Sequence, residues 1–101
     1  MPVILQVDFP FSGPFGAEMA AALTDLANSI NDEPGFIWKI WTENQNEQSA
    51  GGVYLFADHD SAEKYLVMHT ERLAGFGITD VRGKIFDINE PLTELNKGPK
   101  A

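Results

Sequence analysis

The stretch EPGFIWKIW, residues 33–41, decides the fold that we expect for this chain. A Pro-Gly turn followed by aromatic and β-branched residues predicts a β-strand over residues 36–43. Successive side chains of a strand point to opposite faces, so the spacing of three places Trp38 and Trp41 on opposite faces of the sheet. The chain's own helices can cover one of these faces, and the other face needs a different cover.

Length and composition describe a single acidic domain over residues 1–101. The chain is near the commonest domain size and 44% of its residues are hydrophobic, which is ordinary for a globular protein. Its formal net charge is −8, and its seven Lys and Arg residues are scattered. Nucleic-acid-binding domains usually carry basic clusters. We therefore expect no nucleic-acid partner, and we interpret the acidity as a feature that favours solubility.

The chain has no cysteine, which excludes disulfides, thiolate nucleophiles and Cys-ligated metal sites. The absence of cysteine also fits a reducing compartment. Residues 3–9 resemble a strand and lack the basic start and long apolar stretch of a signal peptide. No run approaches the length of a membrane span. We therefore expect a cytoplasmic protein that does not associate with membranes.

The spacing of apolar residues predicts an α+β fold. Apolar residues recur at helical spacing from Met19 to Ile30, and Asp60 with Glu63 has the form of a capping box that opens a second helix. The predicted elements, in chain order, are strand 3–9, helix 15–31, strand 36–43, strand 52–57, helix 60–74, strand 80–88 and a helical turn within 89–96. This β-α-β-β-α-β order favours a ferredoxin-like antiparallel sheet with both helices on one face.

Each predicted strand has one purely apolar face and one mixed face. The apolar faces, expected under the helices, consist of Val3, Leu5, Val7, Phe9, Phe36, Trp38, Ile40, Val53, Leu55, Val81 and Ile85. The mixed faces consist of Ile4, Gln6, Asp8, Ile37, Lys39, Trp41, Tyr54, Phe56, Arg82, Lys84, Phe86 and Ile88. If exposed, the apolar members of the mixed faces would form a patch larger than a soluble monomer usually tolerates. A two-fold homodimer that packs sheet on sheet would cover them, with Trp41, Phe86 and Ile88 in the interface.

Recognised catalytic and phosphate-binding motifs do not occur in the sequence. The glycines at 51–52 and 75–77 fit neither a phosphate loop nor a dinucleotide fingerprint, and we interpret them as turn glycines. The two histidines, His59 and His69, have no paired spacing, so one chain cannot assemble a His-rich metal site. We therefore predict no metal and no cofactor.

His69 is the one polar residue that breaks a pattern, because it lies on the apolar stripe of the predicted helix 60–74. In one interpretation it is a histidine at the edge of the core, hydrogen-bonded to a carbonyl group or to water. In the other it is a neutral imidazole that accepts a proton, or donates a hydrogen bond to a ligand, in a pocket between helix and sheet. Arg72 lies one turn further along and either reaches the same rim or is solvated.

The aromatic residues and Lys39 also allow two interpretations. Trp38 is either part of the core or a pocket wall that stacks on a flat aromatic ligand, whereas Trp41 is assigned to the interface. Tyr54 and Tyr65 are interpreted as structural residues with hydroxyls at a wet edge. Lys39, within a strand of aromatics, is a candidate for binding an anion or for an ion pair across the interface.

Short motifs that belong together occur along nearly the whole chain. They are GPFG (13–16), SIN (29–31), EPGF (33–36), WK (38–39), WTE (41–43), AGGVYLF (50–56), HT (69–70), RL (72–73) and FDINEPL (86–92). Each motif is weak alone, but the combination is specific and resembles the YdhR-type family of monooxygenases, in which function is itself inferred from fold.

This resemblance implies a dimeric α/β barrel related to the antibiotic-biosynthesis monooxygenases. In that wider group, cofactor-free enzymes oxidise polycyclic phenols to quinones in a cavity between sheet and helices. The positions that match the family's motifs are Trp38, Trp41, Tyr54, His69 and Arg72. The resemblance by itself assigns no catalytic role to any of them.

The leading hypothesis is a small cofactor-independent oxygenase that acts on an electron-rich aromatic or phenolic compound with O₂. His69 would be the candidate base and Arg72 its catalytic partner, in a pocket where Trp38, Tyr54 and Tyr65 bind the substrate. The alternative is a homodimeric binding protein that is not an enzyme and holds a small apolar or haem-type ligand, with His69 as the ligating histidine. A structural dimer without a ligand is a third hypothesis.

Overall fold

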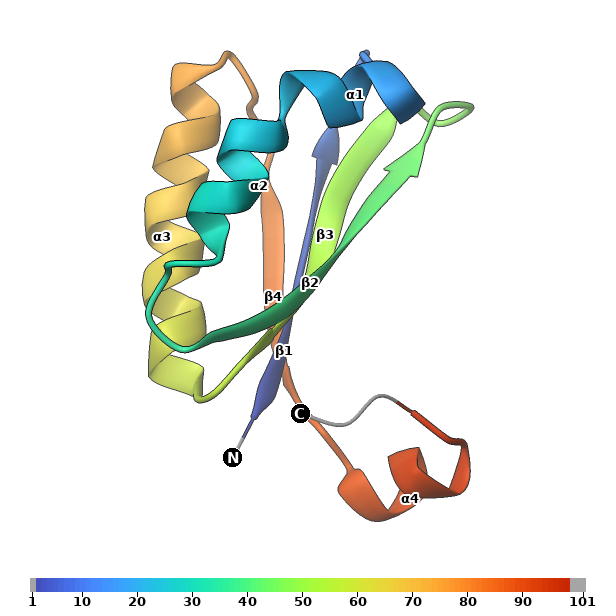
Figure 1. The fold of residues 1–101 in the computed structure, drawn as a ribbon, viewed down its shortest axis with the longest axis vertical. Coiled ribbons are helices and arrows are strands. Elements are labelled where there is room, and N and C mark those ends of the chain that lie inside the picture. Colours follow the sequence, from blue (N-terminus) through green and yellow to red (C-terminus); the bar gives the residue numbers. More distant parts are fainter. Residues whose placement is uncertain (1, 99–101) are drawn as a thin grey trace.

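The computed structural model describes residues 2–98, which form a four-stranded antiparallel sheet with all but the last of its helices on one face (Figure 1). The strands are β1 (Val3–Pro10), β2 (Phe36–Asn44), β3 (Ser49–Phe56) and β4 (Arg82–Asp87), in the order β2-β3-β1-β4 across the sheet. The helices are α1 (Gly16–Ala22), α2 (Thr24–Ile30), α3 (His59–Gly75) and α4 (Glu90–Leu95). The predicted ferredoxin-like β-α-β-β-α-β order is confirmed. Between residues 2 and 98, no helix is both long and apolar enough to cross a membrane.

The helix predicted over 15–31 is in fact two short helices, α1 and α2, that meet at Leu23. The break coincides with Thr24, whose hydroxyl donates a hydrogen bond to the carbonyl oxygen of Ala20 at 2.7 Å. A side-chain hydroxyl that bonds back to the preceding turn bends a helix. The second predicted helix also starts differently, because the N-cap of α3 is Asp58, which accepts a hydrogen bond from the Ser61 amide, and not Asp60.

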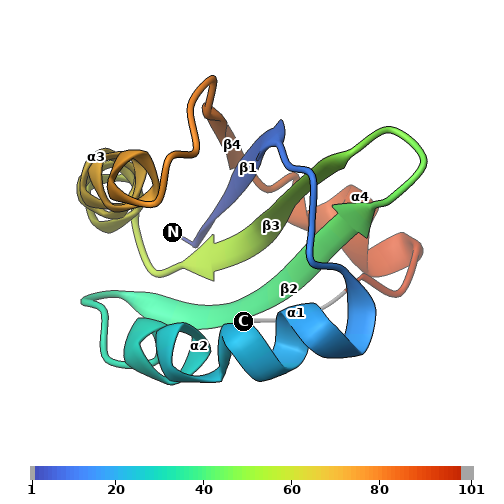
Figure 2. The ribbon, with the colours of Figure 1, turned by 90° about the horizontal axis from the view of Figure 1, so that it is seen from above.

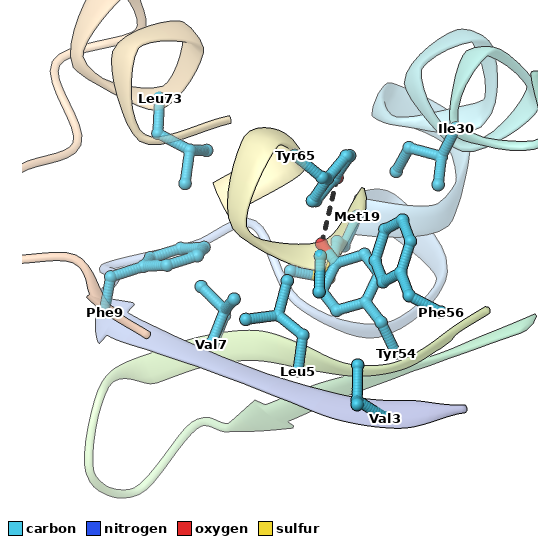
Figure 3. Close-up of a cluster of buried hydrophobic side chains, with 12 residues drawn as sticks. Val3, Leu5, Val7, Phe9, Met19, Ile30, Tyr54, Phe56, Tyr65 and Leu73 are labelled. Carbon is cyan, nitrogen blue, oxygen red and sulfur yellow. Dashed lines mark hydrogen bonds between the residues drawn. The ribbon is translucent and has the colours of Figure 1, made fainter. Parts of the chain in front are cut away.

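The core lies between one face of the sheet and helices α1, α2 and α3, and we call this face of the sheet the helix face. Alternate residues of β1 point into the core, as predicted (Figure 3). The buried side chains around them include Met19, Ile30, Tyr54, Phe56, Tyr65 and Leu73. Burial of each large apolar side chain contributes about 1.5–3 kcal/mol, so this cluster fixes the helices over the sheet.

A β-bulge near the start of β2 changes which side chains face the helices. Phe36 pairs with Phe56, but Trp38 already pairs with Leu55, so strand β2 contains one extra residue, Ile37, at this point. A one-residue shift moves every later side chain of a strand to the opposite face. Phe36 therefore lies on the helix face as predicted, whereas Trp38 leaves it.

The predicted faces are wrong for β2 beyond Phe36, because of this bulge, and also for β3, which has no bulge. Lys39 and Trp41 lie on the helix face, opposite Tyr54 and Gly52 of β3. Trp38 and Ile40 lie on the other side of the sheet, which we call the outer face. In β3 the register with β1 places the residues at positions 54 and 56 on the helix face and those at 53 and 55 on the outer face, the reverse of the prediction. Both faces of these strands carry large apolar residues, so alternation alone could not tell them apart.

Candidate functional site

A pocket of about 800 Å³ lies over the helix face of the sheet, between α1 and α3. Figure 2 shows α1 and α2 beside β2, and α3 apart from them, toward β1 and β4. The apolar lining of the pocket includes Val7, Phe9, Met19, Leu23, Leu26 and Leu73. The pocket extends to three connecting segments, represented by Ser12, Gln48 and Thr79. Strands β2 and β3 and helix α3 contribute Lys39, Trp41, Tyr54 and His69 to the lining.

The floor of the pocket is formed by neighbouring residues of β2 and β3. Lys39 pairs with Tyr54, and Trp41 pairs with Gly52. The Lys39 Nζ atom lies 3.2 Å from the centroid of the Trp41 ring and 4.7 Å from that of Tyr54. A Cβ atom at Gly52 would lie 2.5 Å from Lys39 Cε, so the glycine leaves the space that the lysine side chain occupies.

One wall of the pocket rests on three polar residues of α3 at helical spacing, Tyr65, His69 and Arg72. The Tyr65 and Tyr54 hydroxyls are 3.1 Å apart (Figure 3). Arg72 donates to the Tyr65 hydroxyl at 3.4 Å and to His69 Nδ1 from Nε at 3.3 Å and from a terminal nitrogen at 3.0 Å. The His69 ring stacks on Tyr65 with 5.1 Å between centroids. A continuous network therefore joins α3 to the pocket floor.

Burial and the positive charge of Arg72 control the protonation of this cluster. Burial, followed by Arg72 and Lys39, lowers the pKa of His69 from 6.5 to about 3. Burial and Arg72 lower the pKa of Lys39 from 10.5 to about 7. Burial also raises the pKa of Tyr54 and of Tyr65 above the usual value for a phenol. At neutral pH the site thus holds the cation Arg72 beside a neutral imidazole and neutral phenols, and Lys39 has its pKa close to this pH.

The contact with Arg72 also determines the tautomer of His69. A guanidinium group only donates hydrogen bonds, so His69 Nδ1 accepts and the ring proton resides on Nε2. The imidazole therefore offers a donor to the pocket, and the basic lone pair of Nδ1 is occupied. This geometry favours the donor role for His69 over the base role expected from the sequence.

The structure brings some of the expected site residues together and separates others. Tyr54 and His69 line the pocket, while Tyr65 and Arg72 lie behind it and contact it through those two residues. Trp38, expected in the pocket, lies on the outer face, and Trp41, expected in an interface, lines the pocket instead. Each tryptophan has the place predicted for the other, because of the bulge in β2.

The outer face carries a second groove of about 750 Å³, formed by the sheet and the segment of α4. Trp38, Ile40 and Ile88 line it. Phe86 lies on the same face, because it pairs with Ile4 of β1. Ile40 is 54% exposed and Phe86 is 45% exposed, so this face is incompletely covered by the chain itself. The predicted placement of Phe86 and Ile88 away from the helices agrees with the structure.

Two pocket residues, Lys39 and Trp41, were assigned to the wrong face of the sheet, and Gly52 was interpreted as a turn glycine. A glycine pair inside a strand often marks a close approach of another group, and Gly51 and Gly52 lie within β3. The glycine pair could therefore have indicated from the sequence that another side chain approaches β3 at Gly52. Within residues 2–98, no three His, Cys, Asp or Glu side chains gather in a way that could hold a metal ion.

The sequence matches the model of a known family. Residues 4–99 match the family described as "Putative mono-oxygenase ydhR". No curated protein sequence matches the chain.

The fold is similar to that of solved oxygenase structures. SnoaB, a cofactor-independent oxygenase from Streptomyces nogalater, superposes with a TM-score of 0.63 at 17% identity, over 87% of this chain and 93% of that chain. A protein from Deinococcus radiodurans, described as a "putative antibiotic biosynthesis monooxygenase", superposes with a TM-score of 0.56 at 14% identity, over 88% of this chain and 93% of that chain. At these identities the similarity establishes the fold.

Proposed function

Because the chain belongs to the ydhR family of mono-oxygenases, we propose that it oxidises a small aromatic phenol with O₂, without a cofactor, in the pocket over the helix face. The observation that carries the proposal is the composition of this pocket. It combines an apolar and aromatic lining with three polar groups at one end, Lys39, Tyr54 and His69. Pockets for small molecules typically have this construction and a volume of roughly 300–1,000 Å³.

The pocket suits a flat aromatic ring. Trp41 and Phe9 present aromatic surface, and Met19 and Leu73 add apolar contacts. Offset stacking on an indole contributes about 0.5–1.5 kcal/mol beyond the burial of area. A ring that lies against Trp41 would place a hydroxyl substituent near the polar end of the pocket, so the phenolic group and the polar cluster would meet.

The proposed chemistry begins with the loss of the phenolic proton, which makes the ring electron-rich. The anion then reduces O₂ and forms a carbon–oxygen bond, and the resulting peroxide breaks its O–O bond. One oxygen atom stays as the new carbonyl group of a quinone and the other leaves in water, so the substrate supplies all four electrons. A dry pocket protects the anion from solvent during these steps.

We assign His69 and Arg72 the role of stabilising the negative charge on the substrate oxygen. His69 lines the pocket, and Arg72 holds its imidazole, through Nδ1, in the tautomer that carries the proton on Nε2. Donors that are fixed before the reaction avoid the cost of reorganisation as charge develops. Arg72 is therefore a positioning residue, and Tyr65 supports it through their hydrogen bond.

Oxygen consumption tests this proposal. Purified protein is mixed with anthrone-like and hydroquinone compounds in air, and the uptake of O₂ is followed with an electrode together with the appearance of quinone absorbance. We expect catalytic uptake that requires both substrate and protein, and we expect His69→Gln to reduce it by about 10²–10³-fold, as for the loss of one oxyanion donor. The Lys64→Met variant, on the exposed side of α3, is the matched control.

Absence of O₂ uptake across such a panel would reject the oxygenase. In that case a haem titration, read from the absorption spectrum of wild type and His69→Gln, tests the alternative of a binding protein for a haem-type ligand. The cytoplasmic location expected from the sequence stays a prediction.

We also propose that the protein is a homodimer in which two outer faces pack together. Ile40 and Phe86 are half exposed on this face, and Trp38 lines the groove beside them. In α4, which lies on the opposite side of the sheet from α3 (Figure 2), Leu92 and Leu95 are 59% and 77% exposed. A second copy offers the same apolar surface, so a two-fold contact buries both copies of it at once.

A further inference from the structure

Lys39 is a polar group of the pocket floor that the proposed roles of His69 and Arg72 leave unused. Lysine is among the residues least often buried, yet this side chain lies on the pocket floor between the rings of Trp41 and Tyr54. Among residues 2–98, no carboxylate forms an ion pair with it. Because no ion pair among these residues holds the amine in place, its position depends on the space that the neighbouring backbone leaves for it.

The backbone has space for this amine because of Gly52. A Cβ atom at this position would lie 2.5 Å from Lys39 Cε and 3.3 Å from a ring carbon of Tyr54. Any residue other than glycine would therefore push the lysine out of its place. The strand pair β2–β3 holds Lys39 Nζ over the face of Trp41, and both residues line the pocket.

The groups that face Lys39 come from three elements and include one permanent cation. On α3 they are Tyr65, His69 and Arg72, and on β3 there is Tyr54. A second, smaller hollow beside Lys39 is lined by uncharged residues, which are Ala27, Asn28 and Ile30 of α2 and the following Asn31. Glu47, in the β2–β3 loop, lines the same pocket as Lys39 without forming an ion pair with it. Burial and Arg72 together favour the neutral amine, whose pKa is about 7.

We propose that Lys39 is the base that removes the phenolic proton of the substrate. The inference rests on the proposed oxidation of a phenol in this pocket. The O–H bond of the substrate breaks, an N–H bond forms at Nζ, and a phenolate and an ammonium group remain as an ion pair. The ammonium lies over the Trp41 ring, which favours a cation. This step consumes no oxidant, because O₂ enters only afterwards.

His69 and Lys39 thus have complementary tasks. His69 Nδ1 accepts from Arg72, so the imidazole has only a donor to offer. Lys39 has a free lone pair when it is neutral, and no described residue donates a hydrogen bond to it. An acceptor for the proton and a donor for the resulting oxyanion are the two groups that the ionisation of a phenol needs.

The ionisation step can be measured without the oxidation. The full chain is mixed under nitrogen with 2-naphthol, a two-ring phenol whose ultraviolet absorption shifts when its hydroxyl loses the proton. The experiment is done at about pH 8, between the pKa of Lys39, about 7, and that of an ordinary phenol, about 10. A pH indicator in weakly buffered solution reports whether protons are released as the ligand binds.

We expect wild type to ionise bound naphthol with almost no release of protons, because the proton stays on Lys39. Lys39→Met should lower the ionised fraction of bound ligand by about tenfold or more, since an opposite charge lowers a phenol pKa by roughly 1–3 units. Lys39→Arg keeps a cation that cannot act as a base, so it should ionise the ligand and release about one proton for each ligand bound. Lys64→Met, an exposed lysine on α3, should behave as wild type.

Three results would overturn the inference: release of about one proton per ligand by wild type, ionisation in Lys39→Met equal to wild type, or failure of every phenol tested to bind. Failure of the oxygenase proposal is distinguishable from these results. If ionisation under nitrogen depends on Lys39 but no O₂ is taken up in air, the proposed oxidation is rejected and the role of Lys39 as a base is supported. If Lys39→Met retains full O₂ uptake, the role of Lys39 as the base is rejected and the proposed oxidation is supported.

Discussion

A terminal guanidinium nitrogen of Arg72 lies 3.0 Å from Nδ1 of His69, and this contact determines which ring nitrogen of the histidine faces the pocket. The same contact disfavours a second positive charge on the imidazole. Because the two residues lie three apart on α3, the helix itself brings them together. The role of His69 therefore depends on a neighbour that does not line the pocket.

The stability of the protein should depend on the protonation of His69. Its pKa in the folded state, about 3, is lower than the ordinary value of 6.5. The stability that this difference contributes is complete above pH 6.5 and is lost as the pH falls toward 3. We expect a loss of about 1.4 kcal/mol per pH unit in that range from this one group. Urea unfolding of wild type and His69→Gln at several pH values measures it, and equal pH dependence in the two proteins would contradict the buried neutral imidazole.

Removal of Arg72 should raise the pKa of His69. Burial, the larger cause of the low value, remains in Arg72→Met, so the pKa should increase but stay below 6.5. The exchange is matched in length and keeps an unbranched side chain. An NMR titration of the imidazole protons follows the change directly, with His59, exposed at the start of α3, as an internal reference in the same spectrum. An unchanged pKa would remove Arg72 from its positioning role.

The two tryptophans should respond differently to replacement by alanine. Trp41→Ala removes an aromatic ring from the pocket floor and should weaken the binding of an aromatic ligand by about tenfold, as for the loss of roughly 1.5 kcal/mol of ring contact. Trp38→Ala, on the outer face, should leave ligand affinity within about twofold and weaken self-association. Calorimetric titration with 2-naphthol and sedimentation of both variants give the two readouts. Reversed effects would contradict the register of β2.

Gly52→Ala should damage activity more than its effect on stability explains. The new methyl group displaces Lys39, and overpacking of this kind costs about 1–3 kcal/mol. Gly83→Ala is the matched control, because its methyl group meets the Leu66 side chain of α3, away from the pocket. Thermal unfolding and O₂ uptake are measured for both variants. Equal loss of activity at equal loss of stability would mean that the position of Lys39 is unimportant.

The proposed homodimer should dissociate when a charge is placed in its centre. Phe86→Asp puts a carboxylate on the outer face, and an unpaired buried charge opposes association strongly. Val67→Asp is the control, since Val67 is 60% exposed but lies on α3. We expect Phe86→Asp to sediment as a monomer at micromolar concentration, and wild type and Val67→Asp to sediment as dimers. A wild-type monomer under these conditions would reject the proposal.

Much of the fold could be predicted from the sequence, because local signals reported it. The four strands and the long helix α3 coincide with apolar patterns of the right period, and the order of elements left few topologies to consider. The division of the first helix at Leu23 was missed, because apolar residues continue at helical spacing through it. The true N-cap of α3 was also missed, since Asp60, which lies in the first turn of the helix, has the spacing to Glu63 of a capping box.

The candidate site was predictable in its helical half only. Tyr65, His69 and Arg72 share one face of α3 by their spacing, so the sequence places them together before any tertiary contact is known. Lys39 and Gly52 belong to two strands, and their proximity depends on the pairing register of β2 with β3. The pairing register of two strands depends on both of them and cannot be inferred from either strand alone. The composition of the pocket floor depends on this register.

The opposite placement of Trp38 and Trp41 was determined by the sequence alone, because an odd spacing in a strand always separates two side chains in this way. Which tryptophan faces the helices was decided only by the tertiary structure. The extra residue at Ile37 shifts the strand by one position after Phe36 has entered the core, and whether a strand accommodates such a bulge depends on its partner strand and on the helices above it. The shift brings Lys39 and Trp41 into the pocket and turns Trp38 toward the outer face.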